Sequence, residues 1–134
     1  MSGHSWITPK AKGRNGGLYA TKPISPGEIV CIFGGYVMTR EQTEILPAGL
    51  RDYPIKIFPG YYLGQRTTDD FDDAELVNHS CDPSCRIKNT IFLVASRAIP
   101  DGGQVTFDYA ENDDDFRGFI CTCNSANCRG WIGK

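Results

Sequence analysis

Three cysteines close to the C-terminus constrain the fold of this chain more than any other feature. They occur in the segment Cys121-Thr-Cys123-Asn-Ser-Ala-Asn-Cys128, whose spacing is C-x-C-x4-C. Three thiols in so short a segment cannot easily all pair as disulfides, but they can face one Zn²⁺ ion, which binds its ligands in a tetrahedron. The remaining ligand must come from elsewhere, and Cys81 and Cys85, about forty residues upstream, are both candidates.

Metal binding offers this tail a means of becoming ordered. The tail contains Gly and Asn and few apolar residues, so it has little hydrophobic surface of its own to bury. We therefore predict one structural Zn²⁺ held by Cys121, Cys123, Cys128 and Cys81, with Cys85 as the alternative ligand. The N-terminus has no basic stretch followed by an apolar one, so we expect no secretory signal and a reducing, intracellular compartment in which thiols stay free.

Length and composition indicate a single domain. The chain has 134 residues, of which 40% are hydrophobic, and a chain of this size can bury one core. Its 15 glycines and 8 prolines predict many turns and few long helices, and the lack of a long apolar run excludes a membrane span. Cys31 lies in the apolar run 29–33, and we expect it in the core as a small hydrophobic residue.

The net charge of −2 conceals two halves of opposite sign. Residues 1–66 carry eight Lys and Arg against four Asp and Glu, whereas residues 67–134 carry six against twelve. Nine of these acids fall in two runs, 69–75 and 111–115. The runs are either solvated loops or a docking surface for a basic partner. The acidic second half argues against a nucleic-acid-binding module, which needs clustered Lys and Arg.

Short patterned segments separated by turns predict a β-rich domain with little helix. Thr39 and Gln42 have the spacing of a capping box, which predicts a short helix over 40–46. Asp72 is expected to begin a single helical turn that leads to Val77. The closely spaced turns favour an antiparallel meander. We expect strands at 28–33, 53–58, 91–96 and 104–107.

One stretch carries a more specific pattern. Residues 78–85, Asn-His-Ser-Cys-Asp-Pro-Ser-Cys, resemble the N-H-S-C-x-P-N signature of SET-domain protein lysine methyltransferases, with Ser84 where the family usually has Asn. The resemblance runs in family order from residue 13 to residue 133. Further matching segments are 15–20 (G-x-G-[LV]-[FY]-A), 27–35 (G-E-x-V…G), 97–102 (R-x-I-x-x-G), 106–109 (T-[YF]-D-Y) and 121–130 (the post-SET C-x-C-x4-C-R-G).

The resemblance implies a particular fold and division of the chain. The fold is mostly β, with small curled β-sheets, a knot-like C-terminal threading and a short zinc-binding post-SET tail. Residues 1–116 would form the SET domain, with a minimal insert around 40–70, and residues 117–134 the post-SET segment. The segment that holds Asn78 and His79 would pass beneath a loop formed by the chain near Tyr109.

The family also implies S-adenosylmethionine as methyl donor, with the target lysine entering from the opposite face. Trp131 would close over the adenine once zinc orders the tail. Glu75 stands where many members have Arg, and Phe33 where many have a channel tyrosine. The cofactor contacts assigned by the resemblance are Gly16, Gly17, Leu18, Tyr53, Asn78, His79, Tyr109 and Trp131.

Methyl transfer to lysine requires the neutral amine, although a free lysine has a pKa of about 10.4. A narrow apolar channel, assigned here to Phe33 and Phe107, disfavours the ammonium form by desolvation and aligns the reacting atoms. Tyr109 is the predicted catalytic residue, whose hydroxyl orients the methyl group and stabilises charge rather than acting as a base. Phe107 lacks a hydroxyl, which suggests capacity for two or three methyl additions.

The sequence thus predicts an S-adenosylmethionine-dependent protein-lysine N-methyltransferase acting on a basic protein, with a histone tail as the first candidate. The alternatives are a non-catalytic SET-like module that binds a basic peptide or partner, and a small zinc-containing nucleic-acid module. We expect no direct nucleic-acid binding and no membrane association. The expected location is the nucleus in a eukaryote and the cytoplasm in a microbe.

Overall fold

The computed structural model describes residues 5–113 and 118–133, and its helices and strands are short. In chain order its strands are β1 (Trp6–Ile7), β2 (Ala11–Arg14), β3 (Gly17–Ala20), β4 (Ile29–Ile32), β5 (Tyr36–Thr39), β6 (Ile55–Phe58), β7 (Tyr61–Gly64), β8 (Asn78–His79), β9 (Cys85–Lys88), β10 (Phe92–Ala95), β11 (Gln104–Phe107), β12 (Phe119–Ile120) and β13 (Trp131–Ile132). The helical elements are α1 (Arg40–Glu44), α2 (Tyr109–Asn112) and the 3-10 turns η1 (Ala48–Leu50), η2 (Thr68–Asp70) and η3 (Asp73–Leu76).

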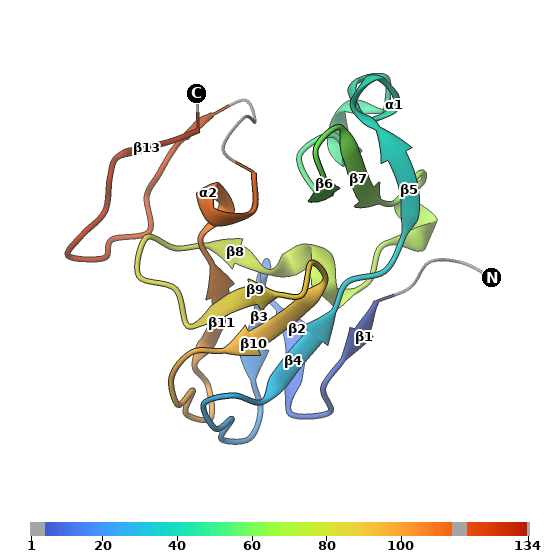
Figure 1. Ribbon diagram of the computed structural model, residues 1–134. Helices are drawn as coiled ribbons and strands as arrows, with labels where there is room; N and C mark the ends of the chain where they lie inside the picture. Colours follow the sequence, from blue (N-terminus) through green and yellow to red (C-terminus); the bar gives the residue numbers. More distant parts are fainter. Residues whose placement is uncertain (1–4, 114–117, 134) are drawn as a thin grey trace.

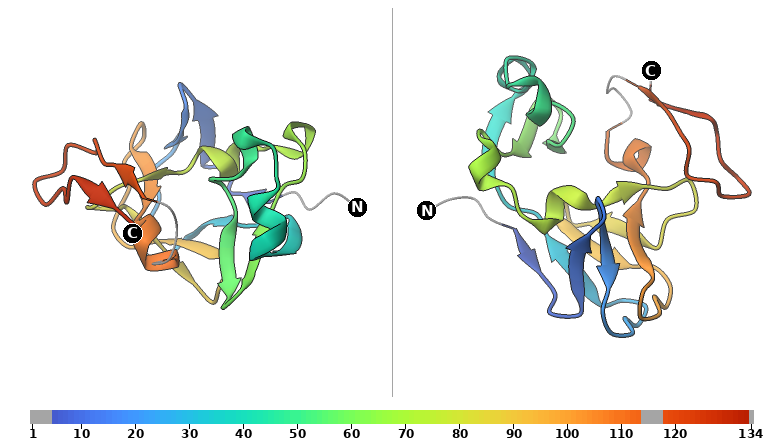
Figure 2. Two further views of the ribbon diagram at one scale, coloured as in Figure 1. Left: turned by 90° about the horizontal axis from the view of Figure 1, so that it is seen from above. Right: turned by 180° about the vertical axis from the view of Figure 1, so that it is seen from behind.

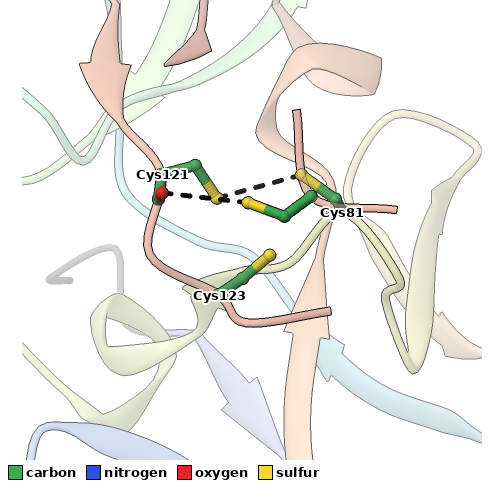
Figure 3. A group of neighbouring side chains, drawn as sticks. Cys81, Cys121 and Cys123 are labelled. Atoms are coloured by element: carbon green, nitrogen blue, oxygen red, sulfur yellow. Dashed lines mark hydrogen bonds between the residues drawn. The ribbon is translucent and has the colours of Figure 1, made fainter. Parts of the chain in front are cut away.

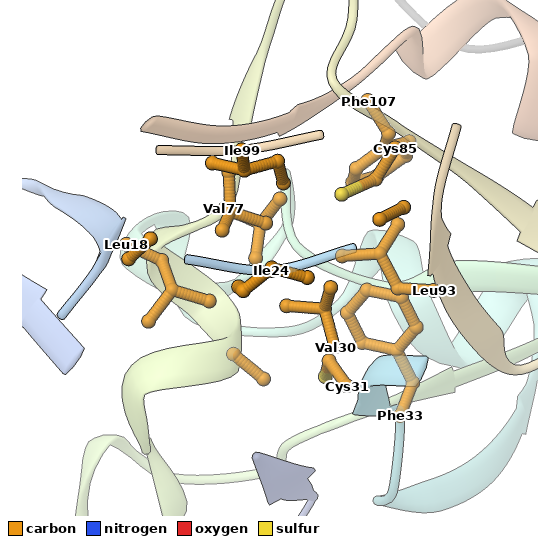
Figure 4. Close-up of a cluster of buried hydrophobic side chains, with 14 residues drawn as sticks. Leu18, Ile24, Val30, Cys31, Phe33, Val77, Cys85, Leu93, Ile99 and Phe107 are labelled. Atoms are coloured by element: carbon orange, nitrogen blue, oxygen red, sulfur yellow. The ribbon is translucent and has the colours of Figure 1, made fainter. Parts of the chain in front are cut away.

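Two four-stranded sheets, with strand orders β1-β4-β10-β9 and β2-β3-β11-β8, supply most of the main core (Figure 1). Burial alternates along several of these strands because neighbouring side chains of a strand point to opposite faces. Leu18, Val30, Leu93 and Val105 are fully buried, and Figure 4 shows three of them in one cluster with Ile24 and other apolar side chains.

β11 lies between β3 and β8, two strands that precede it in the chain. β11 pairs antiparallel with β3 on one side and parallel with β8 on the other, with Phe107 opposite His79. The backbone N–H of Ser80 adds a 3.1 Å hydrogen bond to the carbonyl oxygen of Phe107. This insertion of the C-terminal half beside the segment 78–80 agrees with the threading expected from the sequence, and it brings Tyr109, at the start of α2, next to His79.

The insert, which runs from β5 to β7, forms a separate three-stranded sheet of order β5-β7-β6. Its helix α1 begins at the predicted capping box, in which Thr39 Oγ1 accepts from the Gln42 N–H and Gln42 Oε1 accepts from the Thr39 N–H. The helix ends at Glu44, two residues earlier than expected, because Leu46 turns into a small apolar cluster with Met38 and Leu50.

The C-terminal tail pairs β12 with β13 and contributes a third buried cluster around Cys81, Cys121 and Ile132. Figures 1 and 2 show the tail and the insert on opposite sides of α2. Among the described residues, no helix is long and apolar enough to cross a membrane. The expected division of the chain between residues 116 and 117 stays a prediction.

The strands expected from apolar patterns are present, with β4, β6, β10 and β11 lying within the four predicted ranges. The turn expected at Asp72 is η3, where the Asp72 carboxylate accepts a hydrogen bond from the Ala74 N–H. The mostly β architecture of small sheets is therefore confirmed.

Candidate functional site

Four cysteines from two distant segments meet at the tail. The Sγ atoms of Cys81, Cys121, Cys123 and Cys128 all lie within 4.8 Å of one another, and Figure 3 shows three of these side chains converging. The Sγ atoms of Cys81 and Cys121 are 3.8 Å apart. Two thiolates bound to a tetrahedral zinc with Zn–S bonds of about 2.3 Å would be about 3.8 Å apart. The set therefore fits one zinc ion in a closed site of four sulfur ligands.

Cys85, the alternative ligand, lies outside this cluster. It is fully buried in the main core, where desolvation raises the pKa of its thiol to about 11. The Cys81 sulfur, by contrast, lies within 4.8 Å of the three tail sulfurs, so the geometry favours Cys81 as the remaining ligand. Cys31 is buried in the same core, as the sequence predicts.

The cysteine thiols of the tail differ in pKa. A hydrogen bond with the Ser125 hydroxyl lowers the pKa of Cys123 to about 5, whereas desolvation raises the pKa of Cys121 to about 12. Four thiolates confined to this space would repel one another, so a divalent cation is needed to keep all of them deprotonated.

Donors from the tail and the core surround Cys81. Its Sγ lies 3.5 Å from the backbone nitrogen of Arg129 and 3.4 Å from that residue's Nε. The same guanidinium forms a 2.8 Å ion pair with Asp108, the residue that caps α2. Hydrogen-bond donors around a sulfur stabilise its thiolate form and fix its position.

Tyr109 is held at the junction of β8, β11 and α2. Its hydroxyl donates a 2.6 Å hydrogen bond to the carbonyl oxygen of Val77, and its ring centroid lies 4.8 Å from that of Phe107. A tyrosine hydroxyl has one donor and two acceptor lone pairs. With its proton directed at Val77, the hydroxyl oxygen is left to act as an acceptor. Burial, with the Tyr53 phenol nearby, raises the pKa of Tyr109 above its ordinary value, so the group stays a neutral phenol.

His79 joins Tyr109 to the cysteine cluster. The Tyr109 backbone N–H donates to His79 Nδ1 at 3.1 Å, and His79 Nε2 lies 3.4 Å from Cys81 Sγ. Burial lowers the pKa of His79, which favours the neutral ring. A neutral ring that accepts at Nδ1 carries its proton on Nε2, and this proton faces the sulfur. The Tyr109 backbone and the Cys81 sulfur thus both contact the His79 imidazole.

The two predicted channel residues lie together. Phe33 and Phe107 are both buried, and their ring centroids are 6.1 Å apart. Phe107 also lines a pocket of about 220 Å³. The other residues that line this pocket are Arg86, Ile87, Asp108, Glu111 and Asn112. The aromatic wall of the pocket suits the aliphatic stem of a lysine side chain. Its two carboxylates pair with arginines, Glu111 with Arg86 and Asp108 with Arg129.

The predicted cofactor residues include a glycine turn tethered to β8. Asn78 Nδ2 donates to the carbonyl oxygen of Gly16 at 3.1 Å and to Gln104 Oε1 at 2.9 Å. Asn15 and Gly16 have φ values of 50° and 77°, a left-handed conformation that Asn and Gly tolerate. A Cβ at Gly17 would lie 2.9 Å from the Tyr19 ring, so a larger residue there would force neighbouring side chains to move.

The remaining cofactor candidates differ in exposure. The Leu18 side chain is fully buried in the core, so only the backbone of this residue could meet a ligand. Tyr53 and Trp131 are about half exposed, at 42% and 49%. Tyr53 packs edge-on against Phe71, with ring centroids 5.0 Å apart. Trp131 pairs with Ile120 in the tail sheet. Their contacts with a cofactor stay a prediction.

The acidic run 69–75 is mostly structural rather than a free docking surface. Asp72 accepts from the Ser5 backbone N–H at 2.9 Å, and Asp73 accepts from that of Gly13 at 2.8 Å. In the second run, Asp113 is buried and lies 3.7 Å from Lys56 Nζ, while Glu111 pairs with Arg86. The last two acids of that run, 114 and 115, lie outside the described residues.

Glu75, which occupies the family's arginine position, is a partly buried acid. Its Oε1 atom is buried without a hydrogen-bond partner among the described residues. Desolvation, with the neighbouring Asp72 carboxylate, raises the pKa of Glu75 to about 8, while a hydrogen bond with the Gln65 side chain acts in the opposite direction. The folded protein therefore holds this proton more tightly than the unfolded chain does.

Replacing Glu75 with Gln is expected to remove a pH-dependent loss of stability. Glu75 destabilises the fold progressively as the pH rises from about 4.5 to about 8, because its deprotonation is favoured in the unfolded chain. The melting temperature of Glu75→Gln should therefore rise relative to wild type between pH 5 and pH 9. Glu44→Gln, on the exposed end of α1, is the matched control. If the melting temperatures of Glu75→Gln and wild type changed with pH in the same way across this range, the raised pKa assigned to Glu75 would be wrong.

Comparison with known proteins identifies the family. The SET domain model matches residues 15–110. The chain is 31% identical over 133 residues to the H3 lysine-4 specific histone-lysine N-methyltransferase of Cryptococcus neoformans var. neoformans serotype D, and 30% identical over 131 residues to histone-lysine N-methyltransferase ash1 of Drosophila melanogaster. A β-rich chain with this threading, and with Tyr109 held beside His79, is a SET-domain architecture. The protein belongs to the SET-domain family.

The matched relatives are much longer proteins. The two alignments cover 87% of this chain but 9% of the Cryptococcus protein and 6% of ash1. Among solved structures, a humanized mutant of the Chaetomium thermophilum Polycomb Repressive Complex 2 matches with a TM-score of 0.56 and 18% identity, covering 72% of this chain and 13% of that one. This structural likeness supports the fold.

Two groups in the site are not predicted by spacing in the sequence. The Arg129 guanidinium bridges Cys81 and Asp108, and the Asn112 amide contacts the backbone of Lys56. Arg129 follows Cys128 directly in the C-x4-C-R-G pattern, and this position beside a predicted metal ligand could have indicated that Arg129 belongs to the site. Asn112 has no signal of this kind, because its partner lies 56 residues away.

Proposed function

We propose that this chain is an S-adenosylmethionine-dependent protein-lysine N-methyltransferase that acts on a basic protein, with a histone tail as the first substrate to test. The observation that carries the proposal is the setting of Tyr109, whose hydroxyl oxygen is kept as an acceptor beside the aromatic wall of Phe107. The relatives are named histone-lysine N-methyltransferases, which supports the same reaction.

The residues that would hold the donor are those of the glycine turn, Asn78 and His79, with Tyr53 and Trp131 as aromatic contacts. Their chemistry fits a ligand with amino-acid and adenine parts, because backbone and amide groups suit the first and aromatic rings the second. When bound, S-adenosylmethionine supplies a sulfonium methyl group: the lysine nitrogen bonds to the methyl carbon, the carbon–sulfur bond breaks, and S-adenosylhomocysteine and one proton are released.

The chain's own residues would prepare the lysine. Phe33 and Phe107 are buried and apolar, so a lysine that enters beside them loses hydration and its neutral amine is favoured. The Tyr109 oxygen offers a partial negative charge where a cationic group must be oriented, and its position is fixed by Val77 before any ligand binds. Because neither phenylalanine carries a hydroxyl to hold water, we propose capacity for two or three methyl additions.

Zinc would keep the tail folded over the site. All four cysteines follow His79 in the sequence, and the nearest of them, Cys81, places its Sγ atom 3.4 Å from His79 Nε2. The His79 ring in turn accepts the Tyr109 N–H. A requirement for thiolate ligands suits a reducing compartment, and a histone substrate would place the protein in a nucleus.

Binding of S-adenosylmethionine separates an enzyme from a non-catalytic SET-like module. We expect isothermal titration calorimetry of the zinc-loaded protein to give one saturable site, and Asn78→Ala to weaken it about tenfold, because the glycine turn loses its tether. Asn89→Gly, in the distant β9–β10 turn, is the matched control. A wild-type protein that contains zinc and binds no donor would favour the non-catalytic module.

A further inference from the structure

The last residue of α2 makes a reciprocal contact with the insert. Asn112 Oδ1 accepts from the Lys56 backbone N–H at 3.1 Å, and Asn112 Nδ2 donates to the Lys56 carbonyl oxygen at 3.0 Å. The Lys56 ammonium lies 3.7 Å from the next acid, Asp113. The last residue of α2 and the residue that follows it thus contact both main-chain groups and the side chain of Lys56.

Lys56 lies on β6, an outer strand of the insert sheet. In the insert sheet the order is β5-β7-β6, so among the described residues no strand pairs with the outer side of β6. Both main-chain groups of a strand residue point to the same side, and those of Lys56 point to Asn112 rather than to β7. A primary amide offers a C=O acceptor beside an NH₂ donor, so Asn112 takes the place that a neighbouring strand would occupy.

The contact of Asn112 joins α2 to an insert whose apolar residues form a cluster of their own. The insert has its own apolar cluster of Met38, Leu46 and Leu50, separate from the main core. Ile55 and Leu63 pack against the main core. Asn112 connects the insert to α2 and also lines the pocket beside Phe107.

We propose that Asn112 is a positioning residue: its amide holds β6 against α2 and thereby sets the mouth of the pocket that receives the substrate lysine. The proposal rests on the proposed function for the identity of the ligand, but the contact itself does not. In an alternative role, Asn112 blocks the outer edge of β6 and competes with an incoming peptide for the main-chain groups of Lys56. The two roles predict opposite changes in substrate affinity.

Asn112→Ala tests the proposal in the full chain loaded with zinc. Loss of two ordinary hydrogen bonds should speed hydrogen exchange at the Lys56 amide about tenfold. With a histone H3 tail peptide, KM should rise about tenfold, while kcat and the affinity for S-adenosylmethionine stay at wild-type values.

Thr43→Ala is the matched control, because it removes a hydrogen bond inside the insert, from Thr43 Oγ1 to the Arg40 carbonyl, and leaves the Lys56 contact in place. It should change neither Lys56 exchange nor KM. The proposal is overturned if hydrogen exchange at the Lys56 amide is unchanged in Asn112→Ala. It is also overturned if KM for the peptide stays the same, or if KM falls, as expected when Asn112 competes with the peptide. If wild type transfers no methyl group, the proposed function fails; Lys56 exchange and the calorimetric affinity for the same peptide then decide the role of Asn112.

Discussion

Replacing Tyr109 with Phe should reduce methyl transfer to lysine by about a hundredfold or more while leaving the fold intact, an effect comparable to removing one preorganised polar group from an active site. The ring contacts with Phe107 and His79, at centroid distances of 4.8 and 5.4 Å, do not involve the hydroxyl and remain available to Phe. What is lost is the hydroxyl oxygen that the Val77 carbonyl holds in place. The initial rate of transfer from labelled S-adenosylmethionine measures the effect.

The stability of Tyr109→Phe should fall by only about 1 kcal/mol, the net contribution of one hydrogen bond. Affinity for S-adenosylmethionine should change far less than the rate, since the loss concerns the reacting groups. Tyr61→Phe is the matched control, because Tyr61 is exposed on β7, and it should behave as wild type. Equal rates for Tyr109→Phe and wild type would show that the mechanism proposed for Tyr109 is wrong.

Replacing Cys123 with Ser should abolish zinc binding and loosen the tail. Purified wild-type protein, prepared without chelator, is expected to contain about one zinc per chain, and Cys123→Ser close to none, because a closed structural site needs all four ligands. The buried cluster of the tail is separate from the main core, so the core should stay folded. Limited proteolysis should then cut the segment 118–133 at least ten times faster, as expected where metal binding drives local folding.

Cys85→Ala is the control that distinguishes the two ligand assignments. Cys85 lies in the main core, so this variant should lose some stability through a small cavity but keep its zinc. Loss of zinc from Cys85→Ala, with zinc retained in Cys81→Ala, would reverse the assignment. A wild-type protein without metal would contradict the zinc site altogether.

Local patterns in this chain are reliable where the partners are close in sequence. The capping box of Thr39 and Gln42 is satisfied within one helical turn, and Asp72 caps η3 two residues away. The strand that begins at Gln104 matches its predicted bounds, because turn residues flank an apolar alternation. Tyr109 and His79 could be assigned only through resemblance to the SET family, since nothing in their spacing predicts that the Tyr109 N–H binds the imidazole.

Spacing in the sequence does not settle which distant residues meet. Cys81 and Cys85 stand four residues apart, and spacing alone cannot rank them; the position of the Cys81 sulfur beside the three tail sulfurs does so. The acidic run at 69–75 looks like a solvated or docking surface in the sequence, yet Asp73 binds a backbone N–H 60 residues away. The partner of Asn112 is equally remote.

Mass spectrometry of methylated protein tests the central claim most directly. Recombinant histone H3 would be incubated with zinc-loaded wild-type protein and S-adenosylmethionine carrying a deuterated methyl group, with Tyr109→Phe in parallel. The account predicts deuterated methyl groups on a lysine side chain of the wild-type sample and a much weaker signal for Tyr109→Phe. Protein that binds S-adenosylmethionine and zinc but leaves the lysines of H3 and of a whole histone mixture unmodified would contradict it.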